Sequence, residues 1–300
     1  MARKPQIDAL GEFLLILCSG LMGINQTLVK IVNGGLQPVF QAGLRSACAL
    51  LPVFLFAVLT RKKLSISDGS FWPGILVGLL FSAEFLLVFQ AVEYTTVSRA
   101  SIFFYTMPFW TAVFAHFLIP GERLTLLRIL GLLLAVTGVV LALRNNPGPI
   151  SNQSHIGDLY CLIAGALWAS IVIVARTTKL STSSPEMQLL YQLTVSSIVL
   201  LFLAPLFGDL VRELNTTVIL LFSIQVLVVV SFGFLTWFWV LSVYPASAMA
   251  SFSFLSPVFG VIFGWLILDE NMEGSILIAL ALVSVGVVLV NQKPNQPKRD

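Results

Sequence analysis

Two ionisable side chains that lie within long apolar segments are the residues of this sequence best placed to do chemistry. Arg45 lies in the apolar segment 36–60, and Glu84 lies in the apolar segment 71–92. A guanidinium holds a carboxylate through two parallel hydrogen bonds, and a carboxyl group takes up or releases a proton when its surroundings change. The two residues are therefore candidates for binding an anionic group and, in the case of Glu84, for proton coupling.

The composition indicates that these segments cross a membrane. Hydrophobic residues make up 57% of the 300 residues and charged residues only 10%, whereas soluble domains carry about 25% charged residues. So few charged side chains cannot cover the surface of a soluble protein of this length. We therefore expect a polytopic integral membrane protein, in which an ionisable group within a span costs roughly 2.5–3.5 kcal/mol and marks a functional candidate.

Ten apolar segments are long enough to cross the membrane as helices, because about 20 residues span the ~30 Å hydrocarbon core. The expected fold is all-α, with short polar connections and no separate soluble domain. The ten segments are 10–32, 36–60, 71–92, 97–118, 124–143, 156–176, 186–207, 217–242, 246–267 and 274–291.

The distribution of Lys and Arg predicts the orientation of these helices. With the N-terminus inside, most of the 17 Lys and Arg residues fall in the cytoplasmic connections, among them Arg61, Lys62 and Lys63. Positive residues are enriched on the cytoplasmic side of membrane proteins. We expect a multi-pass protein of the bacterial inner (plasma) membrane, with both termini in the cytoplasm.

On this topology Arg45 and Glu84 reach a similar depth. Arg45 lies about 13 Å below the outer edge of the membrane, and Glu84 lies about 20 Å above the inner edge. In a core of ~30 Å these depths agree to within a helical turn, so we expect the two side chains to face one cavity and to form an ion pair. They either belong to a solute and proton site or form a permanent salt bridge that fastens two helices.

The chain also contains two similar halves, 1–146 and 147–300. The segment YTMPF around Pro108 matches the segment FLSPV around Pro257. Five spans per half is an odd number, so the halves must enter the membrane from opposite sides. Inverted repeats of this kind are typical of secondary transporters, whose substrate site lies near the midplane between the repeats.

Pro108 and Pro257 each lie about 16 Å into their spans. A proline at such a position frees the carbonyl one turn earlier and bends the helix. Corresponding interruptions in the two halves indicate the binding site of a transporter. The alternative is a pair of ordinary kinks that serve only packing.

Several of these motifs occur together in a known family. They are Gly23-Ile24-Asn25 in the first span, Pro38 with Arg45 in the second, the two mid-helix prolines, and Glu122 and Glu270 after the fourth and ninth spans. With this pattern the chain resembles, over nearly its whole length, the EamA-type branch of the drug/metabolite transporter superfamily. The resemblance implies ten helices around a central cavity and movement of small organic metabolites, often amino acids or drugs, commonly as export. Met22 stands where many members carry tryptophan, which points to a different cavity shape and substrate.

Further polar and aromatic residues are candidates for the cavity wall. Tyr105 lies on a polar face of the fourth span, and Trp168 lies about 16 Å deep, where an indole is unusual. Tyr191 and Gln192 fall where Arg45 does in the first half, so they would supply neutral hydrogen bonds. For each the alternative is packing or a hydrogen bond between helices. The predicted substrate-binding residues are Asn25, Arg45, Glu84, Tyr105, Trp168, Tyr191 and Gln192.

For two further motifs we predict a structural role and not a role in substrate binding. Gly260 and Gly264 have the spacing that lets two membrane helices approach closely. Glu122 and Glu270 precede the fifth and tenth spans, where a negative side chain stabilises the N-terminus of the following helix, with a role in gating as the lesser alternative.

The predicted function is a secondary transporter that exports a small organic metabolite, such as an amino acid or an amphipathic compound, by alternating access. The main rival is a nucleotide-sugar or sugar-phosphate carrier, whose multiply charged substrate would need several deep Lys or Arg residues. A membrane-embedded enzyme is a weaker alternative, because the sequence has neither paired acids nor a HExxH motif, and a sensor is weaker because we expect no soluble output domain. The absence of a GxxxxGK[ST] motif excludes ATP-driven pumping by this chain.

The expected partners follow from the same composition. The net charge of +3 is too small and scattered for a nucleic-acid surface. Cys18, Cys48 and Cys161 show no ligand spacing, so we expect no metal site and no cofactor. The partners that remain are a small-molecule substrate and the lipid bilayer, for a monomer or weak homodimer.

Overall fold

The computed structural model describes residues 8–119, 124–144, 153–243, 252 and 255–291. Apart from an isolated bridge between Leu36 and Val211, the regular structure in these residues is helical. The elements of the first half are α1 (Ala9–Asn33), α2 (Pro38–Leu59), α3 (Phe71–Tyr94), α4 (Val97–Phe104), α5 (Met107–Leu118) and α6 (Leu126–Arg144). Those of the second half are α7 (Ser154–Thr177), η1 (Lys179–Thr182), α8 (Pro185–Leu203), η2 (Ala204–Phe207), α9 (Thr216–Ile224), η3 (Gln225–Gly233), α10 (Phe234–Val243), α12 (Leu255–Leu268) and α13 (Gly274–Asn291).

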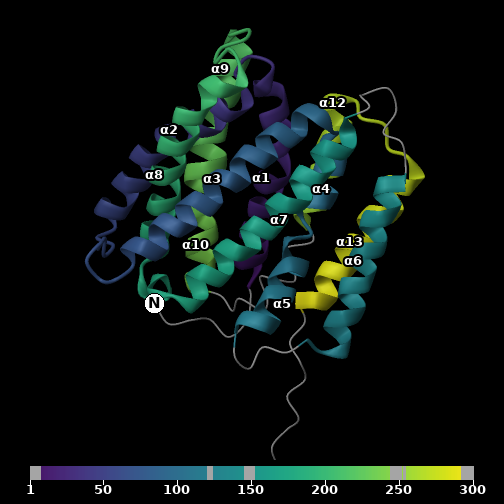
Figure 1. Cartoon of the computed structure of the whole chain (residues 1–300), viewed down its shortest axis with the longest axis horizontal. Coiled ribbons are helices and arrows are strands. Elements are labelled where there is room, and N and C mark those ends of the chain that lie inside the picture. The colour runs from purple at the N-terminus through teal and green to yellow at the C-terminus, as the bar shows by residue number, and fades with distance from the viewer. Residues whose placement is uncertain (1–7, 120–123, 145–152, 244–251, 253–254, 292–300) are drawn as a thin grey trace, which may run out of the picture.

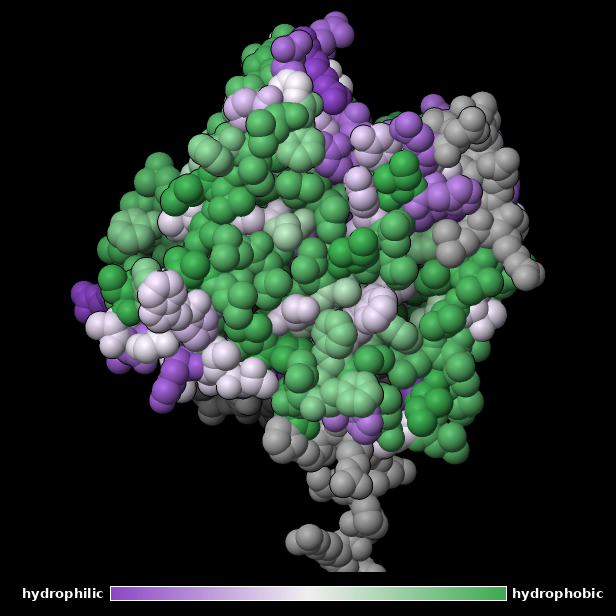
Figure 2. Space-filling view, viewed as in Figure 1, coloured by the Kyte–Doolittle hydropathy of each residue, from purple (hydrophilic) through white to green (hydrophobic). Residues whose placement is uncertain are grey.

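The apolar helices confirm a polytopic, all-α membrane fold. Seven helical segments in the described residues are long and apolar enough to cross a membrane, with α4 and α5 together forming one of them. Three shorter apolar helices, Leu126–Ala142, Leu255–Leu268 and Gly274–Leu289, fall in the remaining predicted spans. Figure 2 shows hydrophobic residues over most of one face of the molecule, with hydrophilic residues mainly near its ends.

Local sequence explains where several helices begin and where one is interrupted. The side chains of Gln37 and Ser184 accept hydrogen bonds from backbone amides of the first turns of α2 and α8, and a proline follows each of them. The fourth span is broken between Phe104 and Met107. Pro108 explains the break, because its ring excludes the carbonyl of Phe104 from an α-helical turn. The predicted interruption is confirmed there.

Pro257, the counterpart of Pro108, lies in the first turn of α12. Most of the chain that precedes this helix lies outside the described residues, so the predicted interruption of the ninth span stays a prediction.

Helices in corresponding positions of the two halves make corresponding contacts. The second spans, α2 and α8, pack against each other, and so do the fifth spans, α6 and α13, which lie side by side at one edge of the molecule (Figure 1). The first span of each half packs against the fourth span of the other: α1 against α12, and α7 against α4 and α5. Each half therefore completes the core of the other.

The eighth span contains an uncommon element. Residues Gln225–Gly233 form a π-helix of nine residues between the α-helical stretches α9 and α10. In keeping with the wider turn, the hydroxyl of Ser231 donates a hydrogen bond to the carbonyl of Val226, five residues earlier. π-Helices are rare and frequently occur at functional sites.

Candidate functional site

Arg45 is held in the interior by residues of α1 and α3. Its side chain is 2% exposed, and Nη1 donates a hydrogen bond of 2.9 Å to Oδ1 of Asn25. The guanidinium carbon lies 4.5 Å from the ring centre of Phe85 and 4.6 Å from that of Phe89. Aromatic faces attract a cation, and the attraction grows where water is excluded. Two of the predicted site residues, Asn25 and Arg45, are therefore brought together.

Glu84 is equally buried, and one of its carboxylate oxygens has no hydrogen-bond partner in the described residues. The side chain is 2% exposed, and the oxygen without a partner is Oε2. No ion pair within 4.0 Å joins it to Arg45, so the predicted salt bridge is not formed in this structure. The aromatic rings of α3 and the amide of Asn25 occupy the surroundings of the guanidinium instead.

The side chains of Arg45 and Glu84 each keep an atom that could form a further hydrogen bond. Nε of Arg45 and Oε2 of Glu84 are both buried without a partner. A buried charge that is not compensated is costly, and the cost is relieved when an ion of opposite sign or a proton binds. The arrangement can therefore hold an anionic group at Arg45 and a proton or a cationic group at Glu84.

A pair of buried amides lies one helical turn from Arg45 on α2. Nε2 of Gln41 donates 3.1 Å to Oε1 of Gln225, the first residue of the π-helix. Oε1 of Gln41 and Nε2 of Gln225 have no partner. Whichever way the two amides are turned, one acceptor and one donor remain free. Sequence reasoning missed this pair, although each glutamine interrupts an apolar segment.

The other predicted site residues of the fourth and sixth spans lie in the interior. Tyr105 is buried at the break between α4 and α5. Trp168 on α7 is half-buried and packs against the main hydrophobic core. The substrate-binding role of both residues stays a prediction, with packing as the alternative.

Tyr191 is not brought to Arg45, and its neighbour Gln192 is buried on α8, where its substrate-binding role stays a prediction. The Tyr191 hydroxyl lies 3.2 Å from the hydroxyl of Ser70, just before α3, and its ring packs against Gly74. Gly74 precedes Phe85 by eleven residues, which is about 16 Å along α3. The reason lies in the topology, because the matching position of an oppositely directed helix lies at the opposite depth.

Gly74→Ala is expected to destabilise the protein by about 1–3 kcal/mol through overpacking. A Cβ at position 74 would lie 2.5 Å from the Tyr191 ring. Gly20→Ala is the matched control, because a Cβ there meets nothing within 4 Å. Denaturant unfolding in detergent measures both variants, and equal unfolding free energies would show that the ring does not press on α3.

A fully buried ion pair was not anticipated from the sequence. Arg99 at the start of α4 is 2% exposed and Asp158 of α7 is 1% exposed. Nε and Nη2 of Arg99 both donate to the Asp158 carboxylate, Nη1 donates to the carbonyl of Ala142, and the Thr95 hydroxyl also donates to Asp158. The one signal that could have found this pair is an acid near the start of the apolar segment 156–176.

Glu270 caps a helix other than the one we expected. Its carboxylate accepts hydrogen bonds from the backbone amides of Val97 and Ser98, which begin α4, whereas α13 starts four residues after Glu270. The chain from α12 folds back over α4, and this brings the carboxylate to the neighbouring helix. The corresponding expectation for Glu122 falls outside the described residues.

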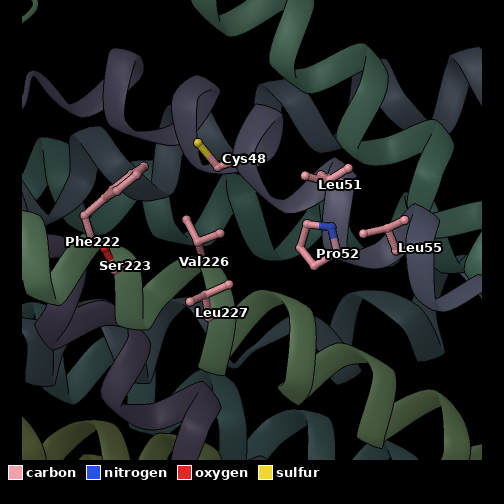
Figure 3. A pocket seen from close by; sticks show the side chains of 8 residues that line it. All are labelled: Cys48, Leu51, Pro52, Leu55, Phe222, Ser223, Val226 and Leu227. Atoms are coloured by element: carbon pink, nitrogen blue, oxygen red, sulfur yellow. The ribbon is translucent and has the colours of Figure 1, made fainter.

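An apolar groove of about 400 Å³ lies between α2 and the α9–η3 segment. Figure 3 shows side chains of both segments around it, and Pro52 continues the face of α2 that carries Arg45, two turns further along. The lining contains no Asp, Glu, His, Lys or Arg. Its residues are Cys48, Leu51, Pro52, Leu55, Phe222, Ser223, Val226 and Leu227.

Comparisons with known proteins agree with this architecture. An uncharacterized transporter of Bacillus subtilis, YoaV, is 24% identical over 90% of this chain and 92% of its own. A probable amino-acid metabolite efflux pump of Escherichia coli is 25% identical over 96% of this chain and 95% of its own. A solved crystal structure covers 92% of this chain and 94% of its own with a TM-score of 0.66 at 17% identity, and so shares the fold. The sequence model of the EamA-like transporter family matches twice, at residues 9–144 and 155–292, and the chain belongs to this family.

Proposed function

We propose that this transporter exports a small organic solute with one carboxylate, such as an amino acid or another amphipathic metabolite, from the cytoplasm. The observation that carries the proposal is Arg45, a buried guanidinium with a free Nε and one neutral partner, Asn25. A solute carboxylate would supply the missing acceptor and the compensating charge. The relative from Escherichia coli, named as an amino-acid metabolite efflux pump, supports this choice.

Transport would proceed by alternating access between two inverted repeats, residues 1–146 and 147–300, in the bacterial plasma membrane with both termini in the cytoplasm. The reciprocal packing of α1 on α12 and of α7 on α4 and α5 supports this organisation. Repeats related by an axis in the membrane plane enclose a site near the midplane, to which each side gains access in turn.

A carrier of nucleotide sugars or sugar phosphates is the second candidate, and the charges favour the first. The described residues contain two fully buried arginines. Arg99 is neutralised by Asp158, which leaves Arg45 alone to face an anion. One available guanidinium suits a substrate with a single carboxylate better than one with two or more negative phosphates.

Glu84→Gln is expected to abolish pH-driven uptake in proteoliposomes while solute exchange continues. Oε2 of Glu84 is buried without a hydrogen-bond partner in the described part of the chain, which makes the carboxyl group a candidate to gain and lose a proton during the cycle. Flux of labelled amino acids measures both activities. The matched control is Glu93→Gln at the outer end of α3, where the carboxylate pairs with Arg212 near the surface. An unchanged pH dependence in Glu84→Gln would leave Glu84 as a structural residue.

The binding step is tested separately by a thermal-shift screen. Amino acids and amphipathic amines are added to purified wild type and Glu84→Gln, and at least one carboxylate-bearing solute is expected to raise the unfolding temperature. If no solute stabilises either form, the assignment of the Arg45 site is wrong.

A further inference from the structure

The outer halves of α1, α4 and α12 are packed through very small residues. A Cβ on Gly23 of α1 would lie 2.8 Å from the backbone nitrogen of Gly260, and one on Gly264 would lie 3.0 Å from the hydroxyl of Ser98. The predicted close approach at Gly260 and Gly264 is therefore confirmed, with α4 and α1 as the partners. Helices α4 and α12 lie side by side (Figure 1).

The interface between α1, α4 and α12, called the seam below, also contains buried polar groups. The hydroxyl of Ser101 donates 2.8 Å to Oε1 of Gln26 on α1. Thr27 is 0% exposed, and its hydroxyl has no hydrogen-bond partner. Gly23, Thr27 and Lys30 recur at four- and three-residue spacing and so share one face of α1. Buried hydroxyls of this kind would gain partners if water entered.

A carboxylate closes the outer end of the seam. Glu270 accepts hydrogen bonds of 2.6 Å from the amide of Val97, 2.9 Å from the amide of Ser98 and 2.7 Å from the Ser98 hydroxyl. Nζ of Lys30 lies 3.9 Å from Oε1 of Glu270 and donates 2.7 Å to the carbonyl of Thr95. Charge-assisted hydrogen bonds of this kind are roughly twice as strong as neutral ones, and the helix N-terminus adds a favourable dipole.

The two parts of the fourth span differ in burial. On the outer side of the break, residues Val97 to Phe103 of α4 are all buried, whereas on the inner side Ala115 is the buried residue of α5. Within the fourth span, the part on the side of Glu270 is therefore the more closely packed. Glu270 comes from the second half and the amides from the first, so separation of the halves at this end must break these hydrogen bonds.

We propose that the seam between α1, α4 and α12 is the outer segment of the solute route, and that Glu270 is the latch that holds it shut. When the route opens, water takes over the amides of Val97 and Ser98 and reaches Thr27 and Ser101. Small polar side chains along the route suit a small zwitterionic or neutral polar solute. The inference rests on the proposed transport function, but it is tested without any solute.

The test measures whether an outside reagent reaches Thr27. Cys18, Cys48 and Cys161 are replaced by alanine and Thr27→Cys is introduced, a change that removes an unbonded hydroxyl. A membrane-impermeant methanethiosulfonate bearing a trimethylammonium group is added to intact cells. Adding Glu270→Gln is expected to raise the labelling rate about tenfold, because the open form gains population when the closed form loses its charged contact.

Two further variants decide how the result is interpreted. Ser98→Ala removes one of the three hydrogen bonds to Glu270 and is expected to raise the labelling rate by a smaller factor. This variant provides the test if Glu270→Gln does not fold. Glu273→Gln, an exposed acid three residues away, is expected to leave the rate unchanged. Equal labelling in the Glu270, Ser98 and Glu273 variants would overturn the proposal, as would folded Glu270→Gln protein that labels no faster than its parent. Labelling that rises in protein without measurable flux would uphold the latch while counting against the proposed transport.

Discussion

Replacing Asp158 with alanine is expected to lower the free energy of unfolding by about 3–5 kcal/mol, because the change leaves the guanidinium of Arg99 buried without its counter-charge. The pair joins α4 to α7, and Arg99 also holds the carbonyl of Ala142 on α6. Three helices therefore lose a common anchor. Denaturant unfolding of the purified protein in detergent measures the change.

The control for this prediction is an ion pair at the same end of the molecule. Arg212 lies 3.0 Å from Glu93, but both side chains are partly exposed. Glu93→Ala is expected to cost about 1 kcal/mol or less, as exposed pairs do. The double replacement Asp158→Leu with Arg99→Met should recover much of the loss, because it removes both buried charges together. A single Asp158 variant as stable as wild type would contradict the role given to the pair.

Replacing Arg45 with methionine is expected to weaken binding of carboxylate solutes by roughly 30-fold or more, which corresponds to about 2 kcal/mol or above for a lost buried charge contact. Arg45→Lys is expected to restore little, because an ammonium cannot present the planar fork that guanidinium offers to a carboxylate. Packing over Phe85 and Phe89 would also change. Thermal shifts with an amino acid and with its amide, which lacks the carboxylate, measure the effect.

The comparison between the two solutes separates binding from folding. Wild type is expected to respond to the acid and not to the amide, and Arg45→Met to neither. Arg61→Met, in the exposed connection after α2, is expected to behave as wild type. If Arg45→Met still distinguishes the acid from its amide, the carboxylate binds elsewhere.

The spans and the break in the fourth span could be predicted because they depend on local sequence. In lipid the backbone N–H and C=O groups of an apolar stretch must bond to one another, so a stretch of sufficient length forms a helix. Pro108 interrupts the helix that contains it, because proline removes a backbone hydrogen bond and clashes with the preceding turn. Depth along the membrane could also be estimated, because it follows from counting residues. Arg45 and Glu84 are both buried, while their depth in the membrane stays a prediction.

What could not be predicted was which face of a helix each residue occupies and which helix it meets. The partner of Arg99, Asp158, lies 59 positions away on α7, so nothing in the local sequence pairs them. Glu270 was assigned to the helix that follows it in the chain, but it caps a helix 172 positions earlier. Tyr191 was grouped with Arg45 by repeat position, although inversion carries equivalent positions to opposite depths.

The nine-residue π-helix in the eighth span has a consequence for the helix that follows it. A π-helical stretch holds one surplus residue relative to an α-helix, so deleting any single residue between Gln225 and Gly233 would restore regular winding. Every later side chain of the span would then be rotated by about 100°. Val240 and Val243, which now pack against Leu15, would turn away from it. The phase of α10 is thus set by a single added residue.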